Sequence, residues 1–328
     1  MSTAESVYSV LIALGLLLNG LAIASGTPMR VLLAPLGDRR LLLGAVVIDL
    51  VLVPVALLAP AVVLALQPGE TAGLVLLAAA STGPIGIALT RIGRGDVPAT
   101  VAIVTALGTA NLVTVPVLLA VLLPEAAGVP AHEVGRTLLL LLVVPLAAGG
   151  VLRRVLARRR WHPEAVTRLT RRLGAASTAC IGAAVTVGLA IDPRGIVVQL
   201  LGPPLVPALL MISMAWMAAT LLTGDGPRRR ALWLTSTARS VGVALAVAAI
   251  HLPGAADTRA TVLAVGGLTQ ALPILLLLAR DRTTGAARAG AARAGGARAG
   301  GGAGGGAGRG AARPRRARRG RRERRPDV

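Results

Sequence analysis

Residues 232–250 read LWLTSTARSVGVALAVAAI, an apolar stretch of membrane-spanning length with an arginine, Arg239, near its middle. An arginine at the centre of a bilayer costs roughly 2.5 to 3.5 kcal/mol on insertion scales. Such a residue is retained where it faces protein, water or an opposite charge. The residues or the cavity that Arg239 faces are therefore expected to be central to the fold.

The rest of the chain has the composition of a polytopic membrane protein. Hydrophobic residues make up 54% of the 328 residues and charged residues 15%, and apolar runs of membrane-spanning length recur along the sequence. One cysteine and three scattered histidines form neither a disulfide nor a metal site, so we expect no metal and no redox cofactor. Isolated serines without a histidine and carboxylate at matching depth also argue against an enzyme.

Nine hydrophobic segments are predicted to span the membrane. The N-terminus lacks the basic region and cleavage site of a signal peptide, so its apolar run counts as the first of them. Arginines are concentrated in alternate loops, which places the N-terminus outside and the C-terminus in the cytoplasm of a plasma or inner membrane. The predicted segments are about 6–25, 41–66, 71–91, 97–123, 134–152, 174–191, 195–223, 231–250 and 258–279.

The order of these segments predicts an inverted repeat. Two sets of four spans flank an unmatched fifth span, which forces the second set into the opposite orientation. We therefore expect an all-α polytopic membrane protein with two inverted-topology four-helix repeats. The predicted domains are 1–123, the first repeat; 124–173, a linking span and basic cytoplasmic segment; 174–280, the second repeat; and 281–328, a tail.

Two arginine-rich segments are predicted on the cytoplasmic side. Residues 153–173 are too basic to span and are expected to lie along anionic lipid headgroups, with Trp161 at the interface. Residues 281–328 consist mostly of glycine, alanine and arginine, a composition that predicts disorder. The tail lacks aromatic residues that could stack on bases, so lipid contact is favoured over specific nucleic-acid binding.

The third predicted span is interrupted near its middle by a polar sequence with two glycines and a proline, residues 81–86. Such breaks are tolerated where protein or a water-filled cavity receives the exposed backbone, although a plain proline kink is the alternative. The eighth span, its topological mate, is also polar near its middle. Paired interruptions favour a substrate or ion site. The candidates are Ser81, Thr82, Gly83 and Gly86 in the third span, and Thr235, Thr237, Arg239 and Ser240 in the eighth.

Asp49 is the acidic residue that lies well inside a span, within LLLGAVVIDLVLVP. Counted from Arg40 and Arg230, Asp49 and Arg239 each lie roughly 13 Å into their spans, near the middle of a ~30 Å hydrocarbon core. We predict that the two residues approach each other, because each would otherwise be an uncompensated buried charge. The pair is either a structural staple or part of substrate or proton coupling.

Further polar residues lie in the fourth and ninth spans. They could line a path, but such residues more often bond neighbouring helices, which is the interpretation we favour. They are Thr100, Thr105, Thr109, Asn111 and Thr114 in the fourth span, and Thr261, Thr269 and Gln270 in the ninth.

Several of these segments resemble the bile acid:sodium symporter family. GPIGIALTRIGRGDVPATVAIVTALGTANLVTVPVLL, residues 83–119, is similar to that family's first crossing helix, its Gly-Asp turn and the following helix. Residues 41–60, 137–154 and 235–253 resemble the preceding helix, the mid-chain helix and the second crossing helix. The resemblance covers about residues 6–280. It implies a panel domain, a core domain, two broken helices that cross at mid-membrane, and alternating access, with one N-terminal helix fewer than some bacterial members have.

The chain departs from the resemblance at the positions that would bind sodium. Ile87 stands where the family uses asparagine, Thr235 and Arg239 stand where it uses glutamate and glutamine, and Val104 replaces another ligand; Thr100 retains its hydroxyl. Sodium needs a shell of oxygens, and isoleucine and arginine side chains offer none. We therefore expect Arg239 to stand in for the sodium ion.

Three functions are compatible with these features. The leading prediction is a secondary transporter of a small organic anion, in which Arg239 contacts a carboxylate or sulfonate from a solvent-reachable cavity. An efflux carrier for a small oxyanion or metalloid acid is the second, as resemblance to arsenite carriers implies, although Cys180 lies away from the crossing. The third is a non-transporting scaffold that acts through its basic tail.

Overall fold

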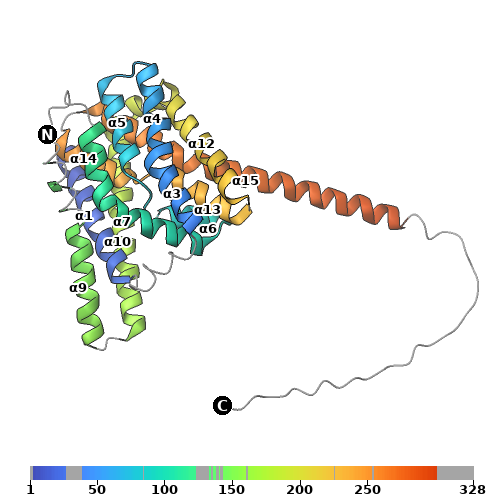
Figure 1. Ribbon diagram of the computed structural model, residues 1–328, viewed down its shortest axis with the longest axis horizontal. Coiled ribbons are helices and arrows are strands. Elements are labelled where there is room, and N and C mark those ends of the chain that lie inside the picture. Colours follow the sequence, from blue (N-terminus) through green and yellow to red (C-terminus); the bar gives the residue numbers. More distant parts are fainter. Residues whose placement is uncertain are drawn as a thin grey trace, which may run out of the picture. The chain divides into compact units, whose positions relative to one another are not determined.

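The computed structural model describes residues 3–26, 39–83, 85–122, 144–159, 162–224, 226–252 and 255–300, with single positions between 133 and 143. Within these ranges the chain is helical, and its extended backbone is limited to one isolated bridge (Figure 1). The helices are α1 (Thr3–Gly26), α3 (Arg39–Val47), the π-helical turn η2 (Ile48–Leu52), α4 (Val53–Val63), α5 (Pro68–Ala79), α6 (Ile85–Ile92), α7 (Val97–Leu122), α9 (Val144–Arg158), α10 (Pro163–Ile191), α11 (Pro193–Leu201), α12 (Leu205–Thr223), α13 (Gly226–Thr237), α14 (Val241–His251) and α15 (Ala256–Gly300).

Length and apolar composition make this a multi-pass membrane protein. Among the described residues, five helical stretches are long and apolar enough to cross a bilayer. They are Thr3–Ser25, Arg39–Val63, Glu164–Ile191, Leu205–Thr223 and Ala256–Arg280, and each overlaps a predicted span.

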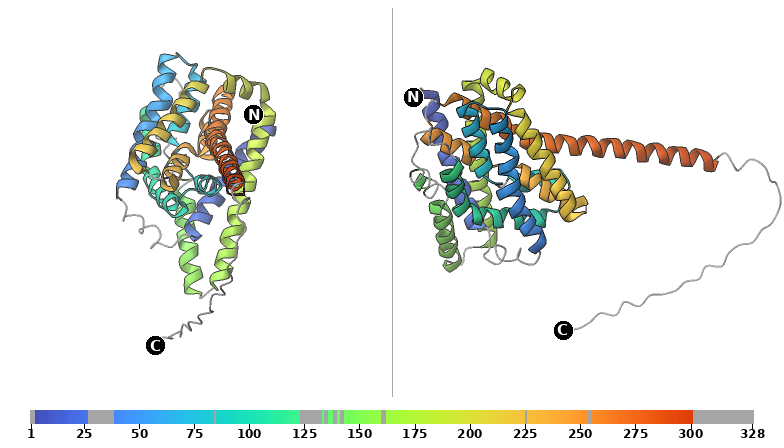
Figure 2. Two further views of the ribbon diagram at one scale, coloured as in Figure 1. Left: turned by 90° about the vertical axis from the view of Figure 1, so that its right-hand side faces the viewer. Right: turned by 45° about the horizontal axis from the view of Figure 1, so that its top comes forward.

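Helices α1, α9 and α10 pack together as a first group. Small residues permit close approach: a side chain at Gly15 would lie 2.7 Å from Ile181 of α10, and one at Gly149 of α9 would lie 2.8 Å from the Leu21 carbonyl. The Ser177 hydroxyl also donates to the Gly15 carbonyl at 2.8 Å. Membrane helices commonly associate through such small-residue contacts and interhelical hydrogen bonds. In Figures 1 and 2, α9 and α10 run side by side.

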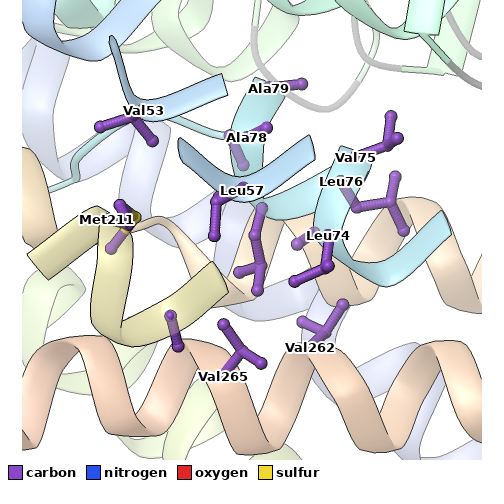
Figure 3. Close-up of a cluster of buried hydrophobic side chains, with 14 of the residues drawn as sticks. Val53, Leu57, Leu74, Val75, Leu76, Ala78, Ala79, Met211, Val262 and Val265 are labelled. Carbon is purple, nitrogen blue, oxygen red and sulfur yellow. The ribbon is translucent and has the colours of Figure 1, made fainter. Parts of the chain in front are cut away.

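The second group surrounds α5 and contains α3 to α7 and α12 to α15. Every residue of α5 from Ala72 to Ala79 is buried. Figure 3 shows the packing around it, with Leu57 from α4, Met211 from α12 and Val262 from α15 converging on Leu74 and its neighbours. A helix that is apolar on all sides is expected to be enclosed by other helices, as α5 is.

Two predictions about helix boundaries are wrong. The predicted span 195–223 is divided into α11 and α12, because Pro203 and Pro204 have no backbone N–H to continue the helix. The predicted start of a span at 174 is also wrong, because α10 begins at Pro163 and runs through that position, while residues 153–158 end α9. Trp161 and most of the predicted span 134–152 before Val144 lie outside the described residues.

The chain divides into a unit of residues 1–279 and a second unit of residues 280–328. Helix α15 continues from the first unit into the second and ends at Gly300. The disorder of residues 281–328 stays a prediction. Residues 301–328 lie outside the described part.

Candidate functional site

The two interrupted helices meet at their interruptions. The first consists of α5, a break that includes residues 80–83, and α6; the second consists of α13, a break at residues 238–240, and α14. Thr82 and Arg239 pair as an antiparallel bridge, and the Ser240 N–H donates to the Ala80 carbonyl at 3.2 Å. Helix α6 packs against α13, and α5 packs against α14. The two polar interruptions predicted from the sequence are therefore in direct contact.

The carbonyls at the end of α5 are all hydrogen-bonded. The last carbonyls of a helix lack intrahelical partners and must be satisfied elsewhere. The carbonyls of Leu76, Ala79 and Ala80 accept from the backbone N–H groups of Ala80, Ser81 and Ser240 respectively. Those of Leu77 and Ala78 accept from Nε and NH2 of Arg239, at 2.9 and 2.8 Å. The guanidinium thus caps the negative end of a half-helix, where a cation is most stable.

Asp49 completes the surroundings of Arg239. Its Oδ1 lies 2.5 Å from NH1 of Arg239, and its Oδ2 accepts from the Ser236 hydroxyl at 3.0 Å. Both charged side chains are fully buried. The predicted approach of Asp49 and Arg239 is therefore confirmed.

A π-helical turn positions Asp49. Residues Ile48–Leu52 form a single π-helical segment between α3 and α4, which together make one long helix. Such turns insert an extra residue into a helix and are frequent at functional sites. Here the turn carries Asp49, which contacts Ser236 at the end of α13.

One part of the prediction for Arg239 is wrong. We expected the guanidinium to face a solvent-reachable cavity, but its side chain has 0% exposure. The physical reason is that one carboxylate and two helix-end carbonyls converge on it from Asp49 and α5. An arginine held in this way joins three segments of the chain, which is the role of a structural staple.

The remaining predicted residues of the two interruptions form two sets. In one set the side-chain hydroxyls are hydrogen-bonded within the protein, and in the other the residues are unpartnered or partly exposed. Thr82, Thr235 and Thr237 are buried, and their hydroxyls donate to backbone carbonyls. Ser81 Oγ is buried without a hydrogen-bond partner among the described residues. Gly83 and Ser240 are partly exposed, and a side chain at Gly83 would lie 3.7 Å from Ser240 Oγ.

Gly86 and Thr100 serve packing between helices. A side chain at Gly86 would lie 2.7 Å from Thr82 Oγ1, so glycine allows α6 to approach the interruption. Thr100 on α7 donates to Thr90 Oγ1 on α6 at 3.1 Å, away from the paired interruptions.

The sequence did not identify Gln270 as part of this site. Its side-chain amide donates to the Arg239 carbonyl at 2.9 Å, which ties α15 to the second interruption. The interpretation that polar residues of the ninth span bond neighbouring helices is confirmed for Gln270. The signal that could have identified it is an amide at mid-depth in the helix that follows the interrupted one.

These features define a class of protein: an all-helical, multi-pass membrane protein in which two interrupted helices cross. The chain belongs to the sodium bile acid symporter family, whose model matches residues 12–199, more than half of the sequence. The matched region includes Asp49 and the first interruption, and Arg239 lies beyond it. Curated proteins yielded no match. The family is one of membrane transporters, so the resemblance identified in the sequence is confirmed, and transport of a solute is the implied activity.

Proposed function

We propose that this protein is a secondary transporter of a small organic anion that works by alternating access without coupling to sodium. The observation that carries the proposal is the contact between two interrupted helices whose shared cation is supplied by the protein itself, as Arg239. The crossing, where the break after α5 meets the break at residues 238–240, is the proposed substrate site. The proposal places the chain in the plasma or inner membrane.

Contacts between loops support the predicted nine-span inverted topology. After α6, the Asp96 N–H donates to the Pro227 carbonyl, and Arg230 NH1 donates to the Gly93 carbonyl, so the end of α6 lies beside the start of α13. Arginines cluster there, at residues 91, 94 and 228–230, which suits the cytoplasmic side. At the far ends, Thr258 at the start of α15 donates to the Gly69 carbonyl at the start of α5. We assign that end to the outer side.

The surroundings of Arg239 support independence from sodium. Carboxylate and carbonyl oxygens are the ligands that hard cations use in proteins, and here such oxygens from Asp49, Leu77 and Ala78 are bonded to a guanidinium. Two further positions that the family resemblance assigns to sodium, Ile87 and Val104, offer no side-chain oxygen to the ion. Arg239 would occupy permanently the role that a bound cation fills transiently.

Since Arg239 is neutralised by Asp49, the proposed substrate contacts lie elsewhere at the crossing. Both α6 and α14 begin there, and the first N–H groups of a helix favour a carboxylate or sulfonate. Ser81, with its unpartnered hydroxyl, and the partly exposed Gly83 and Ser240 lie between these helix ends. Their hydroxyl and backbone N–H groups are the proposed hydrogen-bond donors to the anionic group.

Ligand-induced thermal stabilisation tests the substrate proposal. The purified protein would be heated with a library of carboxylates, sulfonates and small inorganic oxyanions. We expect stabilisation by some organic anions, and loss of that stabilisation in Ser240→Val. Thr178→Val removes an exposed hydroxyl from α10 and serves as the matched control. Stabilisation by oxyanions alone would favour an oxyanion carrier, and unchanged stabilisation in Ser240→Val would place the site elsewhere.

Uptake into liposomes tests the coupling. With a stabilising anion as substrate, we expect the same rate in sodium and in choline buffer at constant voltage. A rate that rises with an inward sodium gradient would contradict the proposed role of Arg239.

The proposal also assigns a partner to the arginine-rich ends of α9 and α10. Exposed arginines on these ends, at positions 154, 158, 168, 171 and 172, would lie on the cytoplasmic side. Anionic lipid headgroups are attracted to such clusters.

A further inference from the structure

Helices α1 and α15 are in contact at residues that lie outside the crossing. Arg259 in the first turn of α15 places NH1 3.8 Å from Oε1 of Glu5 in the first turn of α1. The same guanidinium lies 6.0 Å from the centre of the Tyr8 ring. Glu5 and Arg259 are partly exposed, whereas Tyr8 is buried.

This contact joins the two helix groups. Glu5 and Tyr8 belong to the group of α1, α9 and α10. Arg259 lies in α15, which is hydrogen-bonded to α5 and to the second interruption of the crossing group. A side chain at Gly188 of α10 would lie 3.3 Å from Tyr8 and 3.1 Å from Leu263 of α15. The three helices therefore meet closely at the level of Tyr8.

Helix α1 also contacts the crossing group nearer the middle of its length. Nearer the crossing, a side chain at Gly242, in the first turn of α14, would lie 3.6 Å from Leu16 of α1. At the other end of α1, the close neighbours of Gly20 and Ala24 are Pro145 and Gly149 of α9, in the same group. The contacts of α1 with the crossing group thus include Glu5, Tyr8 and Leu16, and those of Glu5 and Tyr8 lie on the side assigned above as outer.

We propose that Glu5, Tyr8 and Arg259 form a latch that holds the outer side closed and opens during the transport cycle. The proposal rests on the proposed function, because a latch between the groups has a role only if they move relative to each other. In this interpretation the structure is the conformation that is closed on the outer side.

The geometry suits a contact that must break repeatedly. A separation of 3.8 Å is near the limit for an ion pair, and 6.0 Å is at the limit for a cation over an aromatic ring. Both side chains also remain partly exposed, so water can replace their mutual contact when the pair separates. The latch can therefore open without a large free-energy change.

The Tyr8 hydroxyl opposes closure. It is buried without a hydrogen-bond partner among the described residues, an arrangement that destabilises the closed conformation. Opening of the outer side would let this hydroxyl bond water. Removal of the hydroxyl and removal of the ion pair are consequently expected to have opposite effects on the population of the closed conformation.

The test uses one reporter cysteine at the crossing. Cys180→Ser removes the native thiol, and Ser240→Cys places a reporter at a partly exposed position. A membrane-impermeant maleimide is applied to vesicles of each orientation, and the rate of labelling is measured from each side. In the background protein we expect faster labelling from the side opposite the start of α1.

Variants of the latch are expected to change the ratio of outer to inner labelling in opposite directions. Glu5→Gln and Arg259→Gln should each raise the ratio of outer to inner labelling at least several-fold, and the double variant should add little more. Tyr8→Phe should lower that ratio. Arg194→Gln removes an exposed arginine from the first turn of α11 and should leave the ratio unchanged.

Two results would overturn the latch. One is an unchanged ratio in both Glu5→Gln and Arg259→Gln when the variants keep the melting temperature of the background protein. The other is a ratio that Tyr8→Phe raises, even if the charge variants fail to fold. A reporter unlabelled from both sides in every variant would instead count against the crossing as a solvent-reached site, and hence against the proposed function and the latch together.

Discussion

NH1 of Arg239 lies 2.5 Å from Oδ1 of Asp49, a residue 190 positions earlier in the chain. This ion pair joins the long helix of α3 and α4 to the interruption between α13 and α14, and the remaining guanidinium nitrogens bond the end of α5. Because the pair is fully buried, removal of either partner leaves a charge without compensation in a medium of low dielectric.

Arg239→Gln is therefore expected to lower the free energy of unfolding by about 3 to 5 kcal/mol, the range for breaking a buried pair. Unfolding of the purified protein in detergent measures the effect. Asp49→Asn in the same chain should restore a large part of the loss, because it removes the uncompensated carboxylate. If the losses of the two single variants simply add, the residues do not interact as the structure indicates.

Arg239→Lys keeps the positive charge but should still destabilise the protein. An ammonium group is a compact point charge and cannot reproduce the planar fork that reaches Asp49, Leu77 and Ala78 together. We expect a melting temperature between those of the native protein and Arg239→Gln. Equal stability of the lysine variant and the native protein would show that charge alone is required.

Gly73→Ala tests the packing of α5 against α15. An added Cβ at Gly73 would lie 2.8 Å from Thr261 Cβ and 3.0 Å from the Thr258 carbonyl oxygen, so the helices must separate. Overpacking of this kind typically costs about 1 to 3 kcal/mol. Gly267→Ala is the matched control, since an added Cβ there meets nothing within 4 Å. Similar melting temperatures for both variants would contradict the close approach.

Asp96→Ala tests the turn after α6. Asp96 Oδ1 accepts from the Ala99 N–H at 3.0 Å and so caps the start of α7. Loss of such a cap costs about 0.5 to 2 kcal/mol. Asp96→Asn retains an oxygen acceptor at the same position, and its unfolding should stay close to that of the native protein. An equal loss in both variants would point to the charge near Arg228 rather than to the cap.

Truncation after Arg280 separates transport from a scaffold role of the tail. Residues 1–279 form a compact unit by themselves, so the truncated protein should keep its melting temperature and its stabilisation by anions. Loss of stabilisation by every anion that stabilises the full chain would show that the arginine-rich segment contributes to the substrate site.

The sequence predicted the membrane class, the positions of the described apolar helices and the ion pair. Burial of a charge in lipid is costly enough that a lone acid and a lone base at equal depth are strong evidence for each other. Apolar runs also show where helices lie, as for α1 and α7. Hydropathy does not distinguish a proline kink from a helix end, so the division of the apolar run at Pro203 and Pro204 is visible only in the structure.

What the sequence could not determine is which partners enclose a residue. The sequence led us to expect a solvent-reachable cavity at Arg239, because two of the acceptors that enclose it are the backbone carbonyls of Leu77 and Ala78, which leave no signal in side-chain patterns. The sequence also could not predict the contact of Arg259 with Glu5 and Tyr8. This contact joins helices that become neighbours only when the two groups pack. Hydropathy and charge thus defined the class of protein and its buried pair from local composition. The tertiary structure alone decided that the guanidinium is enclosed, since enclosure depends on how distant segments converge.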